Sequence, residues 1–509
     1  MCRYNNPMLI NRVSRQLLAA PELRPLLHEL SIGNDATLAV AQSARPLVLA
    51  ALWAARPCPC LFVVPGEEAA ERAAHALAAW LGKKHVVRYP MRQDLPWSEK
   101  AASEAVVGTR CQAIAHLAAG DLVIAVASAA SLLRRVPPAG SAYYLSKTFA
   151  VGDEFEFEEV SRLLIAMGYA ETGASTDVDV PGTFHVQGDA VDIFPAQGSS
   201  PVRIEFFGDE VDKVRRMVAS TGQTIGELSD VTVAPCRELA FTATTIANAQ
   251  RNLFNRSQES SKIAEDLELI SRHAVDPSLD QYLPDLYGKT ASPLEHLSAQ
   301  TLVALAEPRA LFDDCSRAFD MISAAANASH VKTDGLFTNP RELDFGHQQR
   351  LCFSSILRTG GSVTAELAVR QPGIAGSDAK LLGRLRQMVR DQMAIVFAVP
   401  DRGAREALEL SFTDEGIPFE ESLGAEPANA TPVVQAAEQP HVKPLKRGLV
   451  TFIDAPVPAG VVIPTAALGV LSVSDLASRM TKRRRRFHKV DSTAITFPFK
   501  PGDYVVHAT

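Results

Sequence analysis

The most informative part of the chain reads VPGTFHVQGDAVDIFP over residues 180–195 and PVRIEFFGDEV over residues 201–211. Apolar and polar residues alternate through both runs, and Gly, Pro and Asp interrupt them. Alternation with a period of two predicts β-strands with one buried face, and the interruptions predict tight turns. We therefore predict a small β-rich domain over residues 149–233, with a single helix at Val160–Met167 near its start.

In the second run, alternation divides six residues between two faces of a strand. One face carries Val202, Ile204 and Phe206, and the other carries Arg203, Glu205 and Phe207. Arginine and aromatic residues are the types that dominate interface hot spots, so the second face is a candidate docking surface. The residues alone leave a simpler alternative open, in which Phe207 packs beneath a neighbouring loop and Arg203 pairs with Glu205 or Asp209.

The residues before this domain alternate between helical and strand patterns, which predicts a parallel sheet with crossover helices. The expected elements are a helix at 47–55, a strand at 60–64, a helix at 67–81, a strand at 86–89, a helix at 105–117 and a strand at 122–126. Helical patterns return after residue 233, with a strand at 301–305. We therefore predict one α/β domain in two parts, residues 1–148 and 234–340, interrupted by the β-rich domain.

The remaining residues predict a further α/β domain over residues 341–455, with a strand at 394–399 and a helix at 403–412. Within it, residues 425–446 are rich in Ala, Pro and Gln and predict a loop. Residues 456–509 are expected to be a linker and the start of another domain. The predicted fold class is thus α/β multidomain, as a length of 509 residues also suggests.

The composition, 47% hydrophobic and 21% charged, is typical of a globular protein, and the net charge of −7 argues against a nucleic-acid-binding surface over the whole chain. The apolar stretch 46–64 is interrupted by Arg56 and Pro57, so we expect no membrane span and a cytoplasmic protein. Cys58 and Cys60 are a close pair without further ligands nearby, so we predict buried strand cysteines and no metal site.

The motifs of a nucleotide hydrolase are missing from the sequence. A phosphate loop needs glycines and a Lys, but residues 41–46 read AQSARP, with neither. After the strand at 301–305, Glu307 is a lone carboxylate where a pair would hold Mg²⁺, and we expect it to be a solvated loop residue. We therefore predict no catalytic residues and no cofactor, ATP and Mg²⁺ included, for this chain.

The runs at 180–195 and 201–211 resemble the UvrA-binding domain shared by UvrB and the bacterial transcription-repair coupling factors (Mfd). Residues 89–110, 122–128 and 234–238 are similar to the first domain of the same proteins. The resemblance implies a UvrB-like α/β domain of the P-loop NTPase type whose phosphate loop is degenerate. It also implies that UvrA is the partner and that its contacts fall on Gln187, Arg203 and Phe207. The family usually has Arg at the position of Gln187, so this residue departs from the family pattern.

The far end of the chain favours the coupling factors over UvrB. Residues 471–476, the basic run Lys482–Arg486 and residues 501–507 look like the approach to that family's RNA-polymerase-interacting domain. The resemblance implies an N-terminal fragment in which most of that domain and the translocase motor are missing. RNA polymerase, double-stranded DNA, ATP and Mg²⁺ are then expected partners of the missing part, and a DNA contact by the basic run stays open.

The function implied by this resemblance is an adaptor that recruits UvrA in transcription-coupled nucleotide excision repair, without enzymatic activity of its own. Two alternatives stay open. The first is a UvrB-type ATP-dependent repair enzyme whose phosphate loop has diverged, and the second is a scaffold with another partner.

Overall fold

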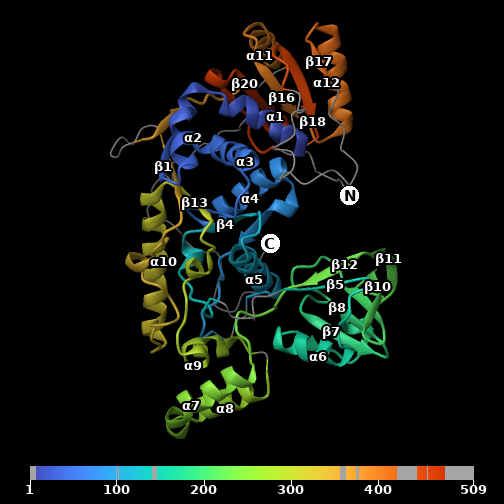
Figure 1. Cartoon of the computed structure of the whole chain (residues 1–509), viewed down its shortest axis with the longest axis vertical. Coiled ribbons are helices and arrows are strands. Elements are labelled where there is room, and N and C mark those ends of the chain that lie inside the picture. The colour runs from blue at the N-terminus through green and yellow to red at the C-terminus, as the bar shows by residue number, and fades with distance from the viewer. Residues whose placement is uncertain are drawn as a thin grey trace, which may run out of the picture.

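The computed structural model describes residues 7–98, 100, 102–139, 146–274, 276–355, 363–373, 378–420, 444–454 and 457–475. These residues form a mixed α/β protein of several domains, with four β-sheets (Figure 1). Residues 425–443 of the loop expected at 425–446, the basic run 482–486 and the segment 501–507 lie outside the described residues. No helix within the described ranges is both long and apolar enough to cross a bilayer.

The largest sheet has seven strands, in the order β15-β1-β14-β13-β2-β4-β3, and every pairing in it is parallel. Its strands are β1 (Ala36–Val40), β2 (Cys60–Val64), β3 (Val86–Tyr89), β4 (Ile124–Ser128), β13 (Leu302–Ala306), β14 (Arg350–Ser354) and β15 (Ala365–Leu367). The sheet contains strands from both sides of the β-rich segment, because β13 pairs with β2.

Two strands of this sheet lie beyond the domain boundary expected at residue 341. Both β14 and β15 follow it in the chain, yet both pair with β1 in the first sheet. The neighbours of a strand in a parallel sheet come from residues far apart in the sequence, and local patterns do not show which strands pair. The first α/β unit therefore extends through β15.

Helices cover both faces of the seven-stranded sheet, as the continuously apolar strands of a parallel sheet require. One face packs against α1 (Pro7–Leu18), α2 (Arg24–Ser31), α3 (Arg45–Ala55) and α4 (Glu67–Leu81). The other face packs against α5 (Glu104–Ala119), α7 (Ala243–Glu259), α8 (Ser261–Ser271), α9 (Leu283–Tyr287) and α10 (Pro308–Ala328). In β2, Phe62 and Val64 point to the first core and Leu61 and Val63 to the second.

The inserted domain contains a six-stranded sheet in the order β11-β10-β9-β8-β7-β6, and it lies to the side of the first sheet (Figure 1). Its strands are β6 (Ala170–Glu171), β7 (Thr183–Gln187), β8 (Ala190–Ile193), β9 (Val202–Phe207), β10 (Glu210–Met217) and β11 (Thr224–Leu228), and a separate pair joins β5 (Lys147–Ala150) to β12 (Asp230–Val233). Helix α6 (Phe157–Ala166) packs against this core through Val160 and Leu164. The predicted β-rich domain with one helix near its start is thus found.

A buried charge network joins the part of the first α/β unit before the inserted domain to the part after it. The carboxylate of Glu238, just after the return from the insertion, accepts hydrogen bonds from Arg110 Nε at 2.5 Å and Arg92 Nη1 at 3.0 Å. Burial alone would raise the pKa of Glu238, but the surrounding guanidinium groups lower it to about 2. A buried carboxylate stays ionised only where positively charged partners are fixed beside it, as the arginines are here.

The last sheet has five strands, in the order β17-β18-β16-β20-β19, and only β19 is antiparallel to its neighbour. The strands are β16 (Ala394–Ala398), β17 (Phe419–Glu420), β18 (Leu449–Ile453), β19 (Val461–Ile463) and β20 (Leu468–Ser472). One face packs on α11 (Asp378–Arg390) and α12 (Arg402–Asp414), while the other joins the core that contains α1 and α3. The expected strand and helix at 394–399 and 403–412 correspond to β16 and α12.

Candidate functional site

The hairpin of β9 and β10 presents Phe207 to solvent. Val202, Ile204 and Phe206 are buried in the domain core, as the alternation predicts, and Phe207 is 82% exposed. A two-residue turn follows, in which Gly208 has a φ of 65°, a conformation that glycine adopts without strain. The Asp209 carboxylate accepts a hydrogen bond from the Phe157 backbone at 3.1 Å and so ties the turn to the start of α6. The alternative in which a loop covers Phe207 is therefore wrong.

Arg203 is held by Asp192 on the neighbouring strand β8. Its Nε and Nη2 atoms donate to the two carboxylate oxygens of Asp192 at 2.7 and 2.8 Å, and these hydrogen bonds raise the pKa of Arg203. Asp192 is 1% exposed, whereas a quarter of the Arg203 side chain remains accessible. The alternative in which Arg203 pairs with Glu205 or Asp209 is wrong, since Arg203 donates to Asp192 and Glu205 accepts from Arg215.

Gln187 lies at the exposed end of β7 and belongs to the same outer face. Its Oε1 accepts a hydrogen bond from Ser175 Oγ at 3.1 Å, and that hydroxyl accepts from Arg203 Nη2 at 3.4 Å. In the sheet register, Gln187 lies opposite Ala190, which lies opposite Glu205. Since Phe207 follows Glu205 by two positions, the structure brings the three predicted residues onto one face of the sheet.

Sequence reasoning missed Asp192 and Ser175, which position Arg203. Asp192 belongs to the quoted run VPGTFHVQGDAVDIFP, so its place in the motif was the available signal. It lies opposite Arg203 because β8 and β9 pair antiparallel with Asp192 in register with Arg203. Ser175 comes from a 3₁₀ turn outside both runs and carried no comparable signal.

The charge of the inserted domain excludes one class of ligand. Residues 148–239 contain 17 acidic and 6 basic residues, a formal net charge of −11, while the whole chain carries −7. A surface with this balance repels the phosphates of a nucleic acid. The exposed face around Phe207 is therefore suited to a protein partner.

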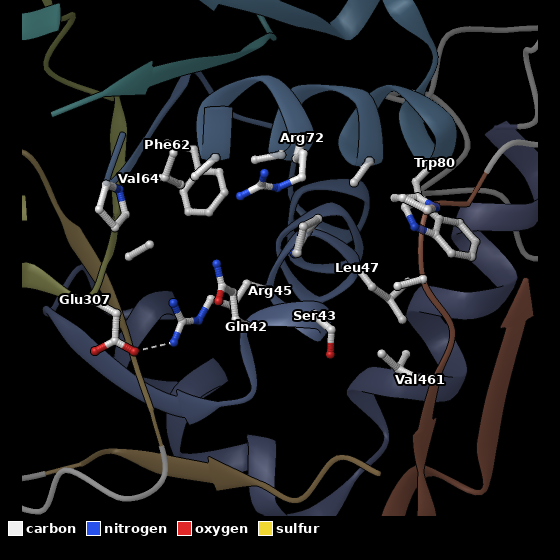
Figure 2. A pocket seen from close by; sticks show the side chains of 18 of the residues that line it. Gln42, Ser43, Arg45, Leu47, Phe62, Val64, Arg72, Trp80, Glu307 and Val461 are labelled. Atoms are coloured by element: carbon white, nitrogen blue, oxygen red, sulfur yellow. Dashed lines mark hydrogen bonds and ion pairs between the residues drawn. The ribbon is translucent and has the colours of Figure 1, made fainter. Parts of the chain in front are cut away.

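The loop at residues 41–46 ends in a buried ion pair. Residues Gln42–Ala44 form a 3₁₀ turn, and α3 starts directly at Arg45, with Pro46 in its first turn. Arg45 is 4% exposed, and its Nη2 lies 2.5 Å from Glu307 Oε1 (Figure 2). Ser355 Oγ also donates to that oxygen. The expectation that Glu307 is a solvated loop residue is wrong, because Arg45, distant in sequence, pairs with it.

The cysteines of the described residues are free thiols. Cys60 is buried at the start of β2, as expected, while Cys58 lies before the strand and is half-buried; burial raises the pKa of both thiols. Across the described ranges, no three His, Cys, Asp or Glu residues are grouped so that they could hold a metal ion.

The chain is similar to one known domain family and to several known proteins. Residues 148–239 match the UvrB interaction domain family. The chain is 24% identical to a transcription-repair-coupling factor of Bacillus subtilis over 94% of its own length and 42% of that protein. It is 35% identical to the same factor of Myxococcus xanthus over 41% of this chain and 18% of that protein. It is also 35% identical to UvrABC system protein B of Clostridium botulinum over 24% of this chain and 18% of that protein.

The chain spans about two-fifths of the length of the coupling factors that it matches over most of its own residues. The match to UvrABC system protein B is confined to a much smaller part of the chain. The domain that carries Phe207 matches the UvrB interaction domain family, and the chain is similar to transcription-repair-coupling factors over most of its length.

Proposed function

We propose that this chain acts as an adaptor that recruits UvrA in transcription-coupled nucleotide excision repair. The observation that carries the proposal is the exposed aromatic ring of Phe207, on a rigid hairpin of a UvrB interaction domain. An exposed aromatic on a regular element loses little conformational entropy when a partner covers it, which makes it an effective binding anchor.

The three residues of the face have different roles in this proposal. Phe207 inserts into an apolar pocket of UvrA. Asp192 binds one side of the Arg203 guanidinium, and the solvent-accessible part of that side chain contacts UvrA at the periphery of the interface. Gln187 adds an uncharged hydrogen-bonding group where related proteins usually have Arg, so it contributes less than either neighbour.

The first α/β unit is proposed to be a degenerate P-loop domain of the UvrB type that neither binds nor hydrolyses ATP. Its parallel sheet and the turn before α3 have the arrangement in which a phosphate loop would open the helix. Here Arg45 and Glu307 neutralise each other at that place, and Pro46 has no N–H to donate to a phosphate. A triphosphate would have to displace this pair without the compensation of a Lys.

In a complete coupling factor, ATP-dependent translocation on double-stranded DNA and displacement of RNA polymerase are proposed to belong to parts of the protein outside this chain. We propose that the chain recruits UvrA in the cytoplasm. The alternative of a UvrB-type ATP-dependent enzyme is less favoured, because it requires the Arg45–Glu307 pair to open and because the coupling factors match far more of the chain.

A competition assay tests the proposal. UvrA is labelled, bound to UvrB, and titrated with this chain in the absence of nucleotide. The adaptor function predicts mutually exclusive binding, because both proteins would use the same kind of interaction domain. Simultaneous binding of both, or no binding of this chain at concentrations well above 10 μM, would reject the proposal in favour of a scaffold with another partner.

A further inference from the structure

A cavity of about 600 Å³ lies between the first α/β unit and the five-stranded sheet, away from the face that carries Phe207. Its walls come from α3, α4 and β2 on one side and from residues 457–461 and Val470 on the other (Figure 2). This volume is within the range of pockets that hold small molecules. Neither the proposed docking of UvrA nor the described core needs it.

The larger part of the cavity is apolar. On α4, the side chains of Ala69, Ala73 and Ala76 line it at a spacing that places them on one helix face. Because alanine side chains are small, they leave space in the cavity that larger side chains at these positions would occupy. Trp80 and Val461 close one end (Figure 2), so the cavity offers an aromatic and aliphatic surface to a flat or chain-like ligand.

The other end is polar and carries more positive than negative charge. Arg45 and Arg72 enter from the two helices α3 and α4, and Glu307 is the carboxylate among the lining residues (Figure 2). Arg72 also pairs with Glu68 on the solvent side of its helix, which does not line the cavity. Two guanidinium groups facing one carboxylate favour an anion there.

Arg45 is the buried member of this polar end. It is 4% exposed, and its Nη2 is engaged by Glu307. The same side chain lines the cavity, so a ligand anion there would lie beside a guanidinium group that is largely removed from water, where a charged hydrogen bond is stronger than on the surface.

We propose that this cavity binds a small amphipathic anion: an aromatic or aliphatic body seated against α4 and Val461, with a single carboxylate or sulfonate toward Arg45 and Arg72. A nucleoside triphosphate does not fit this description, since Glu307 would repel a polyanion that brings no compensating Lys. The ligand would contact both sheets at once, so its binding would stabilise their association.

The test uses 1-anilinonaphthalene-8-sulfonate as an anionic probe and N-phenyl-1-naphthylamine as its uncharged counterpart. Fluorescence titration of the full chain is expected to show one saturable site for the sulfonate, with affinity about tenfold or more above that for the amine, as expected for a hydrogen-bonded ion. Saturating sulfonate should also raise the melting temperature.

Three variants locate the site. Ala73→Leu fills the cavity and should reduce affinity about tenfold or more, whereas Ala79→Leu, on the same helix but outside the lining, should not. Arg72→Gln changes an exposed side chain, so the fold is retained, and should weaken sulfonate binding about threefold while leaving amine binding unchanged. Equal binding of both probes, equal affinity of wild type and Arg72→Gln, or no saturable binding at about 1 mM would overturn the proposal.

Discussion

The β9–β10 hairpin and the turn before α3 each stand where a ligand or partner would be expected, but they present opposite surfaces. The hairpin leaves Phe207 82% exposed, while the turn ends in the buried pair of Arg45 and Glu307. Both regions contain an arginine held by a carboxylate. The difference lies in what stands beside that pair: an uncovered aromatic ring in one case and a self-neutralised loop in the other.

Residue type alone does not identify a docking site. Arg203 and Arg45 both form close ion pairs with a carboxylate from another element, Asp192 within β8 and Glu307 directly after β13. Only the first has an accessible edge next to a large exposed hydrophobic side chain. Exposure of an aromatic on a rigid element is the feature that separates a binding face from a closed one.

The largest expected effect concerns a third ion cluster, the buried network around Glu238, in which the carboxylate and the arginines that bind it are all buried, unlike in either of the two regions. Glu238→Gln should lower the free energy of unfolding by about 3 to 5 kcal/mol at pH 7, because it takes the carboxylate from the fully buried guanidinium of Arg110 and leaves the network with an excess positive charge. Urea unfolding measures the loss. Glu158→Gln, on the exposed surface of α6, is the control and should change stability by less than about 0.5 kcal/mol.

The same carboxylate predicts the direction of the pH dependence. The pKa of Glu238 is about 2 in the folded chain and ordinarily 4.5, so the unfolded state takes up a proton first as the pH falls. The stabilisation is complete above about pH 5 and is lost between about pH 4.5 and 2. Glu238→Gln should flatten this part of the stability profile, and an unchanged profile would contradict the assignment.

Next in size is the effect of Arg203→Ala on the inserted domain. Removing the guanidinium leaves Asp192 buried and unpaired, which should cost about 2 to 3 kcal/mol of stability. The double variant Arg203→Ala with Asp192→Ala should recover most of that loss. Arg215→Ala breaks a more exposed pair with Glu205 and should cost less than about 1 kcal/mol. Equal losses for both arginines would show that burial of the carboxylate does not matter.

A smaller effect is expected at Gln187. Gln187→Ala should weaken UvrA binding about twofold, whereas Gln187→Arg should strengthen it about threefold by adding a charged planar group at the rim of the face. Calorimetric titration with UvrA distinguishes the two. Weaker binding by Gln187→Arg would mean that this end of β7 lies outside the contact.

The smallest effect is predicted for nucleotide. With a dissociation constant above about 1 mM, 0.1 mM ATP with Mg²⁺ should add less than about 0.1 kcal/mol of stability, below what a melting curve resolves. A fluorescent ATP analogue should likewise not bind. Micromolar affinity that disappears when residues 41–46 are replaced would contradict the closed-loop interpretation and revive the enzyme alternative.

Much of the fold could be predicted because its signals are local. Alternation in 202–207 gave the correct buried and exposed faces of β9, and the apolar run at 60–64 corresponds to β2. The failures concern contacts between distant residues. Arg45 meets Glu307 across 262 positions, and β14 joins β1 across more than 300. Parallel sheets create such pairings, and no short pattern in the sequence encodes them.

The candidate site shows the same division. The three residues on one face followed from a motif and a period of two, but the partner of Arg203 did not. A strand pattern states which side a residue faces and not which neighbour lies opposite, since that depends on the register between strands. Asp192 could therefore be found only in the folded sheet.

The most direct test of the account is the affinity of UvrA for Phe207→Ala, compared with Ile225→Ala at a 62% exposed apolar position on β11 of the same sheet. The account predicts that Phe207→Ala binds about ten- to a hundredfold more weakly, the range for a hot-spot residue, with stability changed by less than about 0.5 kcal/mol. Ile225→Ala should bind like the unmodified chain. If calorimetry shows unchanged affinity for Phe207→Ala, the exposed ring is not the docking anchor and the central claim fails.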